Sequence, residues 1–201
     1  MLFDLIASET SPLSLSEEDV AALAACERGT ILLDVAARAD ATLIALTGTN
    51  GWITLSLRAG RLDGEQVLGA VGRPEGPSGA GSAGGIQRRV FDAEDALGLD
   101  DGRPHTIAVT VNETGTHLYA DGYECFSTTL TAFLAQIGLT DVRIDPDGIA
   151  AVTRLAAWAE PLSDRAVMAQ SLAVTPLVQF AASELSARDA RRTGALATGS
   201  I

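Results

Sequence analysis

Apolar and polar residues alternate along much of the chain, and this pattern predicts short β-strands. In WITLSLR, residues 52–58, Ile53, Leu55 and Leu57 fall on one face and polar side chains fall on the other. Residues 105–112 alternate in the same way, with Ile107 among the inward positions. By pattern and composition, strands are predicted at residues 30–38, 41–48, 52–58, 86–92, 105–112 and 152–160.

A tight hairpin is predicted at HLYADGY, residues 117–123. An Asp-Gly pair between two alternating arms is a strong hairpin signal, because glycine accepts a positive φ without steric cost. The arms place Leu118 and Ala120 inward and the side chains of His117, Tyr119 and Asp121 outward. Aromatic and polar groups should therefore share one surface of this hairpin.

Only two short helices are expected. Ser14 and Glu17 have the spacing of a capping box and predict a helix that ends near Gly29. Pro161 to Asp164 open a second helix that runs to about Gln170. Many short strands with local hairpins and few helices indicate an all-β protein, an antiparallel two-sheet sandwich.

Charge narrows the function classes. The chain has 201 residues, 47% of them hydrophobic, and a net charge of −12, which indicates a folded domain with an acidic surface. Such a surface repels phosphate backbones, so we expect no nucleic-acid partner. The chain contains no lysine, which excludes a P-loop lysine, a Schiff base and a lysine general base.

The compartment is not defined by the sequence. The N-terminal residues lack a basic region and a small-residue cleavage site, so no signal peptide is expected, and no apolar run is long enough to span a membrane. Cys26 and Cys125 are read as free thiols, with a disulfide as the alternative. Their spacing and the presence of only two histidines give no metal site.

The end of the chain repeats its beginning. LSARDARRTGALATGSI, residues 185–201, matches LSEEDVAALAACERGTI, residues 15–31, with conserved spacing. We therefore divide the chain into an N-terminal lead (1–14), one β-sandwich domain (15–176), and a linker that starts a second similar module (177–201). The alternative is two unrelated segments that each lead from a helix into a strand.

Three segments resemble the laminin G-like, concanavalin A-type jelly roll. They are Arg28 to Ile31, HTIAVTVNETGTHLYADGYE (105–124) and RLAAWAEPLSD (154–164), and the likeness covers roughly residues 15–172. Similar modules accompany sialidases and other glycoside hydrolases. The resemblance implies a lectin-like carbohydrate-binding module, the N-terminal part of a larger enzyme, although the missing signal peptide departs from an extracellular role. Some relatives bind calcium, but Asp145 to Gly148 are more simply a turn, so no cofactor is expected.

Catalytic motifs are not convincing. Residues 79–84 match GxGxxG, but no strand precedes them and no helix follows, so they are read as part of a flexible loop at 73–85. His105 is read as a structural residue at a strand entry. No serine or cysteine has an obvious local base, so no catalytic residue is assigned and a free-standing enzyme is the least favoured hypothesis.

Sugar binding needs an aromatic face and a few fixed polar groups, and an acidic sugar also needs arginine. If the strands concerned share a sheet, the candidate ligand-binding residues are Trp52, Arg58, His117, Tyr119, Asp121 and Arg143. Trp158 is read as core, packed under the closing helix. The favoured hypothesis is a glycan-binding module, for an acidic glycan, next to a neighbouring module of the same longer chain. The alternative is a structural module without a sugar ligand.

Overall fold

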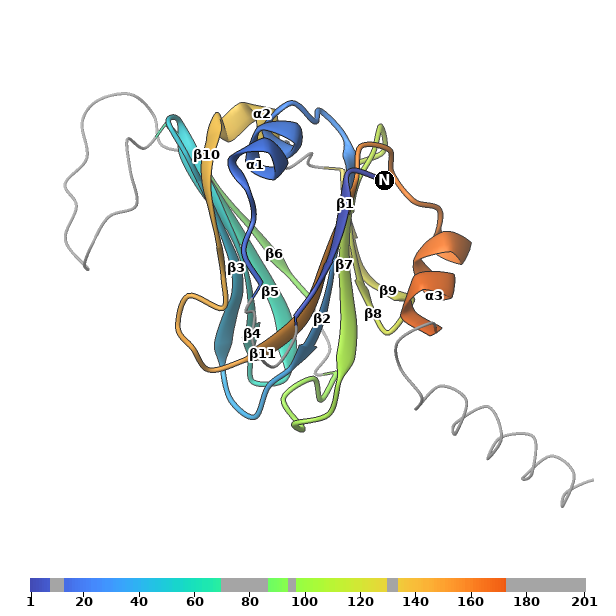
Figure 1. Ribbon diagram of the computed structural model, residues 1–201. Helices are drawn as coiled ribbons and strands as arrows, with labels where there is room; N and C mark the ends of the chain where they lie inside the picture. Colours follow the sequence, from blue (N-terminus) through green and yellow to red (C-terminus); the bar gives the residue numbers. More distant parts are fainter. Residues whose placement is uncertain (8–12, 70–86, 94–96, 130–133, 173–201) are drawn as a thin grey trace, which may run out of the picture.

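The computed structural model describes residues 1–7, 13–69, 87–93, 97–129 and 134–172. They form two antiparallel sheets that face each other (Figure 1). The six-stranded sheet has the order β1 (Phe3–Ile6), β11 (Ala151–Trp158), β2 (Gly29–Ala36), β7 (His105–Val111), β8 (Thr116–Ala120) and β9 (Tyr123–Thr128). The five-stranded sheet has the order β10 (Leu139–Ile144), β3 (Ala41–Gly48), β4 (Gly51–Arg58), β5 (Arg61–Leu68) and β6 (Gln87–Asp92). The predicted all-β sandwich is confirmed.

The main core lies between the sheets and follows the alternation of the sequence. Leu55 and Leu57 of β4 are buried there with Leu33 of β2, Ile107 of β7 and Leu155 of β11. Because successive side chains of a strand point to opposite faces, this core leaves the polar set of β4 on the outer surface. Among the described residues, no helix is long and apolar enough to cross a membrane.

Two short helices, α1 (Glu17–Ala24) and α2 (Leu134–Ile137), lie at one end of the sandwich (Figure 1). The predicted helix at residues 17–29 is present, but it is shorter and has a different cap. The Ser16 hydroxyl accepts the Asp19 N–H, and the Asp19 carboxylate accepts the Ser16 N–H. Ser16, not Ser14, is therefore the residue that satisfies the first free backbone donors of the helix.

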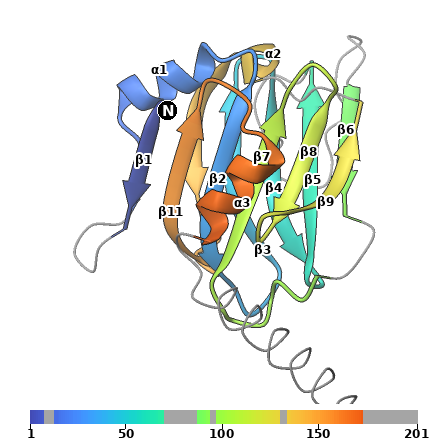
Figure 2. The ribbon, with the colours of Figure 1, turned by 90° about the vertical axis from the view of Figure 1, so that its right-hand side faces the viewer.

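The third helix, α3 (Asp164–Leu172), covers the outer face of the six-stranded sheet (Figure 2). Val167 of this helix forms a second, smaller hydrophobic cluster with Leu32 and Tyr119 of the sheet. Trp158 packs against this cluster, as expected for a residue under the closing helix. The Tyr119 hydroxyl donates a 2.9 Å hydrogen bond to Asp164. Burial, with Asp164 beside the ring, raises the pKa of Tyr119 far above its usual range.

A polar cluster lies on the same face and ties the N-terminal strand to the helix. Arg154 of β11 binds Asp4 of β1 through two hydrogen bonds of 2.8 Å and donates a third, of 3.0 Å, to Gln170 of α3. Asp34 of β2, which is 1% exposed, lies 3.9 Å from Arg154 and accepts the Thr106 hydroxyl. Burial raises the pKa of Asp34, while Arg154 lowers that of Asp4.

Three strands, β1, β5 and β10, were not among those predicted. Residues 1–14 were interpreted as a lead outside the sandwich, but β1 pairs with β11 and is part of the sheet. Its four residues are too few to show a period. Strand β5 was missed because its inner face carries Gly64 and Gln66 between the apolar positions. The Gly-rich loop at 73–85 and the repeat at 185–201 lie outside the described residues.

Candidate functional site

The outer face of the five-stranded sheet is the candidate site. In the part of the chain that the structure describes, α3 covers only the other sheet, and no helix lies over this face (Figures 1 and 2). The inner side chains of β4, β3 and β10 belong to the core, so their alternate residues point outward. We call this surface the Trp52 face.

Strand pairing brings two rows of outward residues side by side. In one row, Trp52 opposes Thr47 and Val67, which in turn oppose Asp141 and Arg88. Asp141 and Arg88 each lie two strands away from Trp52. Since neighbouring strands are about 4.8 Å apart, their backbones are on the order of 10 Å from that of Trp52.

The second row lies beside the first. Thr54 opposes Ala45 and Glu65, and Arg143 and Val90 lie beyond them. These small and β-branched neighbours leave the indole as the one aromatic ring of the two rows.

Two ion pairs flank the indole. The Arg143 guanidinium binds the Asp141 carboxylate at 3.0 Å, and the Arg88 guanidinium binds Glu65. Both arginine side chains are 68% exposed, so further N–H donors of each fork remain available to a ligand. The carboxylate partners fix the direction of each guanidinium, and they also offer acceptors to sugar hydroxyls.

Trp52 itself is half-buried. Its neighbour Val67 is 6% exposed, and the indole Nε1 is buried without a hydrogen-bond partner among the described residues. The face thus combines a ring for C–H stacking with donors and acceptors on both sides.

Arg58 belongs to the same face but lies at the far end of β4. It is six positions from Trp52, which corresponds to about 20 Å along a strand. Arg58 pairs with Asp63 at 2.8 Å, and it opposes the exposed Arg61 across the hairpin. One sugar ring cannot contact both Trp52 and Arg58.

The structure separates the remaining candidates from this face, so the condition that all six residues share one sheet is wrong. His117 and Tyr119 lie in β8 of the six-stranded sheet, and Asp121 lies in the turn after it. Tyr119 lies on the outer face, as predicted, but it is 3% exposed because α3 covers it. The His117 ring contacts Glu124 at 3.1 Å and Thr114 at 3.0 Å.

Asp121 has a structural role in the turn. It has φ +50° before Gly122, and its carboxylate accepts the Thr106 N–H and lies 2.8 Å from His105 Nδ1. Asp121, with Asp101 on the other ring nitrogen, raises the pKa of His105. The structural interpretation of His105 is thereby supported by two carboxylate contacts.

Sequence reasoning missed Glu65 and Arg88 as site residues. The signal for Glu65 was the hairpin turn at Ala59 and Gly60, both with positive φ, which predicts a strand directly after β4. Strand β6 was predicted, but β5, the strand that pairs with it, was not. Arg88 could be placed opposite Glu65 only once β5 was known.

The segment from Asp145 to Gly148 is a turn, as expected. Asp145 accepts the N–H groups of Ile149 and Ala150, and its carbonyl accepts the Gly148 N–H. Within the described ranges, no group of three or more histidine, cysteine or acidic residues could hold a metal ion. Cys26 and Cys125 are free cysteines in the structure, and burial raises the pKa of both thiols.

These features define an antiparallel jelly-roll β-sandwich with one helix-covered face and one face without a covering helix among the described residues. No family model matches the chain, and no curated protein matches it. Among solved structures, it is similar to the Ruminococcus gnavus IT-sialidase CBM40, with a TM-score of 0.60 and 17% identity over 85% of this chain and 99% of that one.

The same module bound to α2,3 sialyllactose gives a TM-score of 0.59 at 18% identity, covering 85% and 98% of the two chains. The binding domain of botulinum neurotoxin serotype C1 gives 0.53 at 11% identity, covering 81% and 40%. At such identities the likeness concerns the fold.

Proposed function

We propose that this domain is a non-catalytic carbohydrate-binding module and that its glycan lies on the Trp52 face. The observation that carries the proposal is the position of Trp52 between two arginine–carboxylate pairs on one face of the five-stranded sheet. The indole supplies the stacking surface, and the flanking pairs supply directed hydrogen bonds on either side. A disaccharide or longer glycan would contact all three elements.

We further propose that the glycan is acidic. An arginine fork matches a carboxylate with two parallel hydrogen bonds, and Arg88 and Arg143 both keep exposed donors. Fold similarity to a sialidase module that binds sialyllactose supports this choice. The same similarity supports a place beside a glycoside hydrolase such as a sialidase, where the module would raise the effective concentration of substrate.

The test is calorimetric titration with 3′-sialyllactose and with lactose. We expect sialyllactose to bind more tightly, and Trp52→Ala and Arg88→Gln each to weaken binding at least tenfold. Arg58→Gln is the matched control, because it removes an arginine of equal exposure from the same face about 20 Å away. It should leave the affinity unchanged.

Each outcome has a distinct meaning. Equal binding of lactose and sialyllactose would contradict the proposal of an acidic ligand but would still support a carbohydrate-binding module. If Arg58→Gln lowers the affinity as much as Arg88→Gln does, the proposed position of the glycan site around Trp52 is wrong. A blank glycan array with a normally folded protein would favour the alternative, a structural or interaction module without a sugar ligand.

A further inference from the structure

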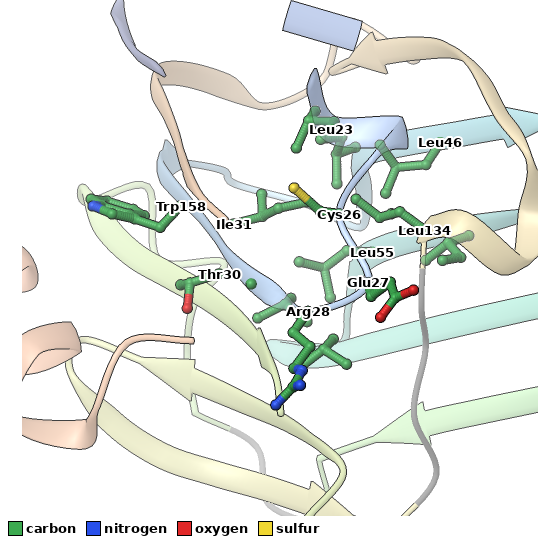
Figure 3. A pocket seen from close by; sticks show the side chains of 15 residues that line it. Leu23, Cys26, Glu27, Arg28, Thr30, Ile31, Leu46, Leu55, Leu134 and Trp158 are labelled. Carbon is green, nitrogen blue, oxygen red and sulfur yellow. The ribbon is translucent and has the colours of Figure 1, made fainter. Parts of the chain in front are cut away.

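A second feature of the molecule, apart from the Trp52 face, is a cavity between the two sheets. It lies at the end where α1 and α2 close the sandwich, and Figure 3 shows the side chains that line it. Its volume is about 70 Å³. The side chains around it come from both sheets and both helices and include Leu23, Ile31, Leu55, Val109 and Leu134. The surrounding surface is almost entirely apolar.

The few polar side chains at the cavity are already satisfied or point elsewhere. The Thr30 hydroxyl contacts that of Thr110 at 3.0 Å and accepts the Leu162 N–H. The Cys26 thiol donates to the Ala22 carbonyl. A water molecule needs two to four polar partners, so the cavity suits a hydrocarbon group better than water.

Among the described residues that line the cavity, the charged ones lie where it meets the loop between α1 and β2. Glu27 and Arg28 line this side, and both residues are exposed (Figure 3). Arg28 is paired with Glu113, while Glu160 lines an adjoining depression with Glu27 and Arg28. Glu27, Glu113 and Glu160 outnumber the single guanidinium on this side of the cavity, which disfavours an anionic group at this position and favours a cationic one.

We propose that this cavity binds the alkyl end of a small amphipathic amine. The chain of the ligand occupies the space between the sheets, and its ammonium group lies beside Glu27 and Glu160, which line the cavity and the adjoining depression. This site is independent of the proposed glycan site, because the cavity lies on the inner side of β4 while Trp52 lies on the outer side.

The experiment uses the whole chain with ¹³C-labelled methyl groups and titrates it at low ionic strength. The probes are butylamine and hexylamine, the alcohols of equal length, and butanoate and hexanoate. We expect the methyl signals of Ile31, Val109 and Leu134 to shift, with the amines binding most tightly and the carboxylates least. Each added methylene should tighten binding about fourfold until the cavity is filled.

Two variants test the assignment. Val109→Leu reduces the free volume and should weaken every probe, while Val90→Leu, the same substitution at an exposed position of β6, should not. Glu27→Gln should weaken the amines more than the alcohols. Comparing the melting temperatures of the variants shows whether each is folded.

The wild-type titration is decisive without the variants. Methyl shifts at the cavity in the order amine, alcohol, carboxylate support the proposal. Carboxylates that bind as tightly as amines overturn it, as does the absence of any shift at the methyl groups of the cavity. Shifts confined to Val67 and Val90 would indicate binding on the Trp52 face and would also overturn it.

Discussion

Replacing Arg154 by methionine tests how the N-terminal strand and α3 are held on the sheet. Methionine keeps the apolar stem of the side chain but removes the guanidinium, so packing is largely preserved and the charge is lost. The change removes both hydrogen bonds to Asp4 and the one to Gln170. It also leaves the buried Asp34 carboxylate without its nearest cation.

The expected loss of stability is large. Removing one partner of a buried ion pair typically costs about 3–5 kcal/mol, because the remaining charge stays desolvated. The Arg154 side chain is 10% exposed and that of Asp34 2%, but that of Asp4 is 27% exposed and regains water. We therefore expect a decrease of about 3 kcal/mol in the free energy of unfolding, mostly from Asp34.

Urea unfolding followed by tryptophan fluorescence measures this decrease. Adding Asp34→Asn to Arg154→Met should recover roughly half of the loss, because the unpaired charge is gone. The loss should also shrink at acidic pH. Burial raises the pKa of Asp34 in the folded state, so its unfavourable contribution is absent below its ordinary value of 3.8 and grows as pH rises through the folded value. A decrease below about 1 kcal/mol at neutral pH, or one independent of pH, would refute the reasoning.

Two further predictions concern the same sheet. Tyr119→Phe removes the hydrogen bond to Asp164 and should cost about 1 kcal/mol in the free energy of unfolding; no change would mean that α3 is held by apolar packing alone. His105→Gln should destabilise the protein most at acidic pH. The folded pKa of His105 is raised, so its stabilisation is complete below the ordinary value of 6.5 and is lost as pH rises through the folded value. A pH-independent difference between His105→Gln and wild type would show that the imidazole is not charged in this way.

The fold could be predicted from the sequence further than the site could. The alternation at Ile53, Leu55 and Leu57 correctly gave the inner face of a sandwich strand, because burial of one face is a local property of a strand. Which strands lie next to each other is not local. Both 52–58 and 116–120 have an outward polar set, but only the strand order shows that Trp52 and Tyr119 lie on opposite sheets.

Tyr119 illustrates the second limit. Its outward direction followed from the period of the hairpin, yet the residues that bury it, Val167 and Asp164, come from a helix more than forty residues away in sequence. A side chain on the outer face of a sheet is exposed to solvent only when no other element packs on that face. The position of α3 depends on an apolar patch on the sheet that no single strand displays.

The order β1-β11-β2 has a consequence for how the chain folds during its synthesis. Phe3 of β1 faces Ala157, and Thr30 of β2 faces Trp158, so β11 separates two strands that are synthesised well over a hundred residues before it. Until the ribosome has completed β11, β1 has no neighbour and one edge of β2 is open to other chains. Nascent chains halted before residue 151 should therefore depend on chaperones, and release of residue 158 from the exit tunnel should mark the point at which the domain becomes resistant to proteases.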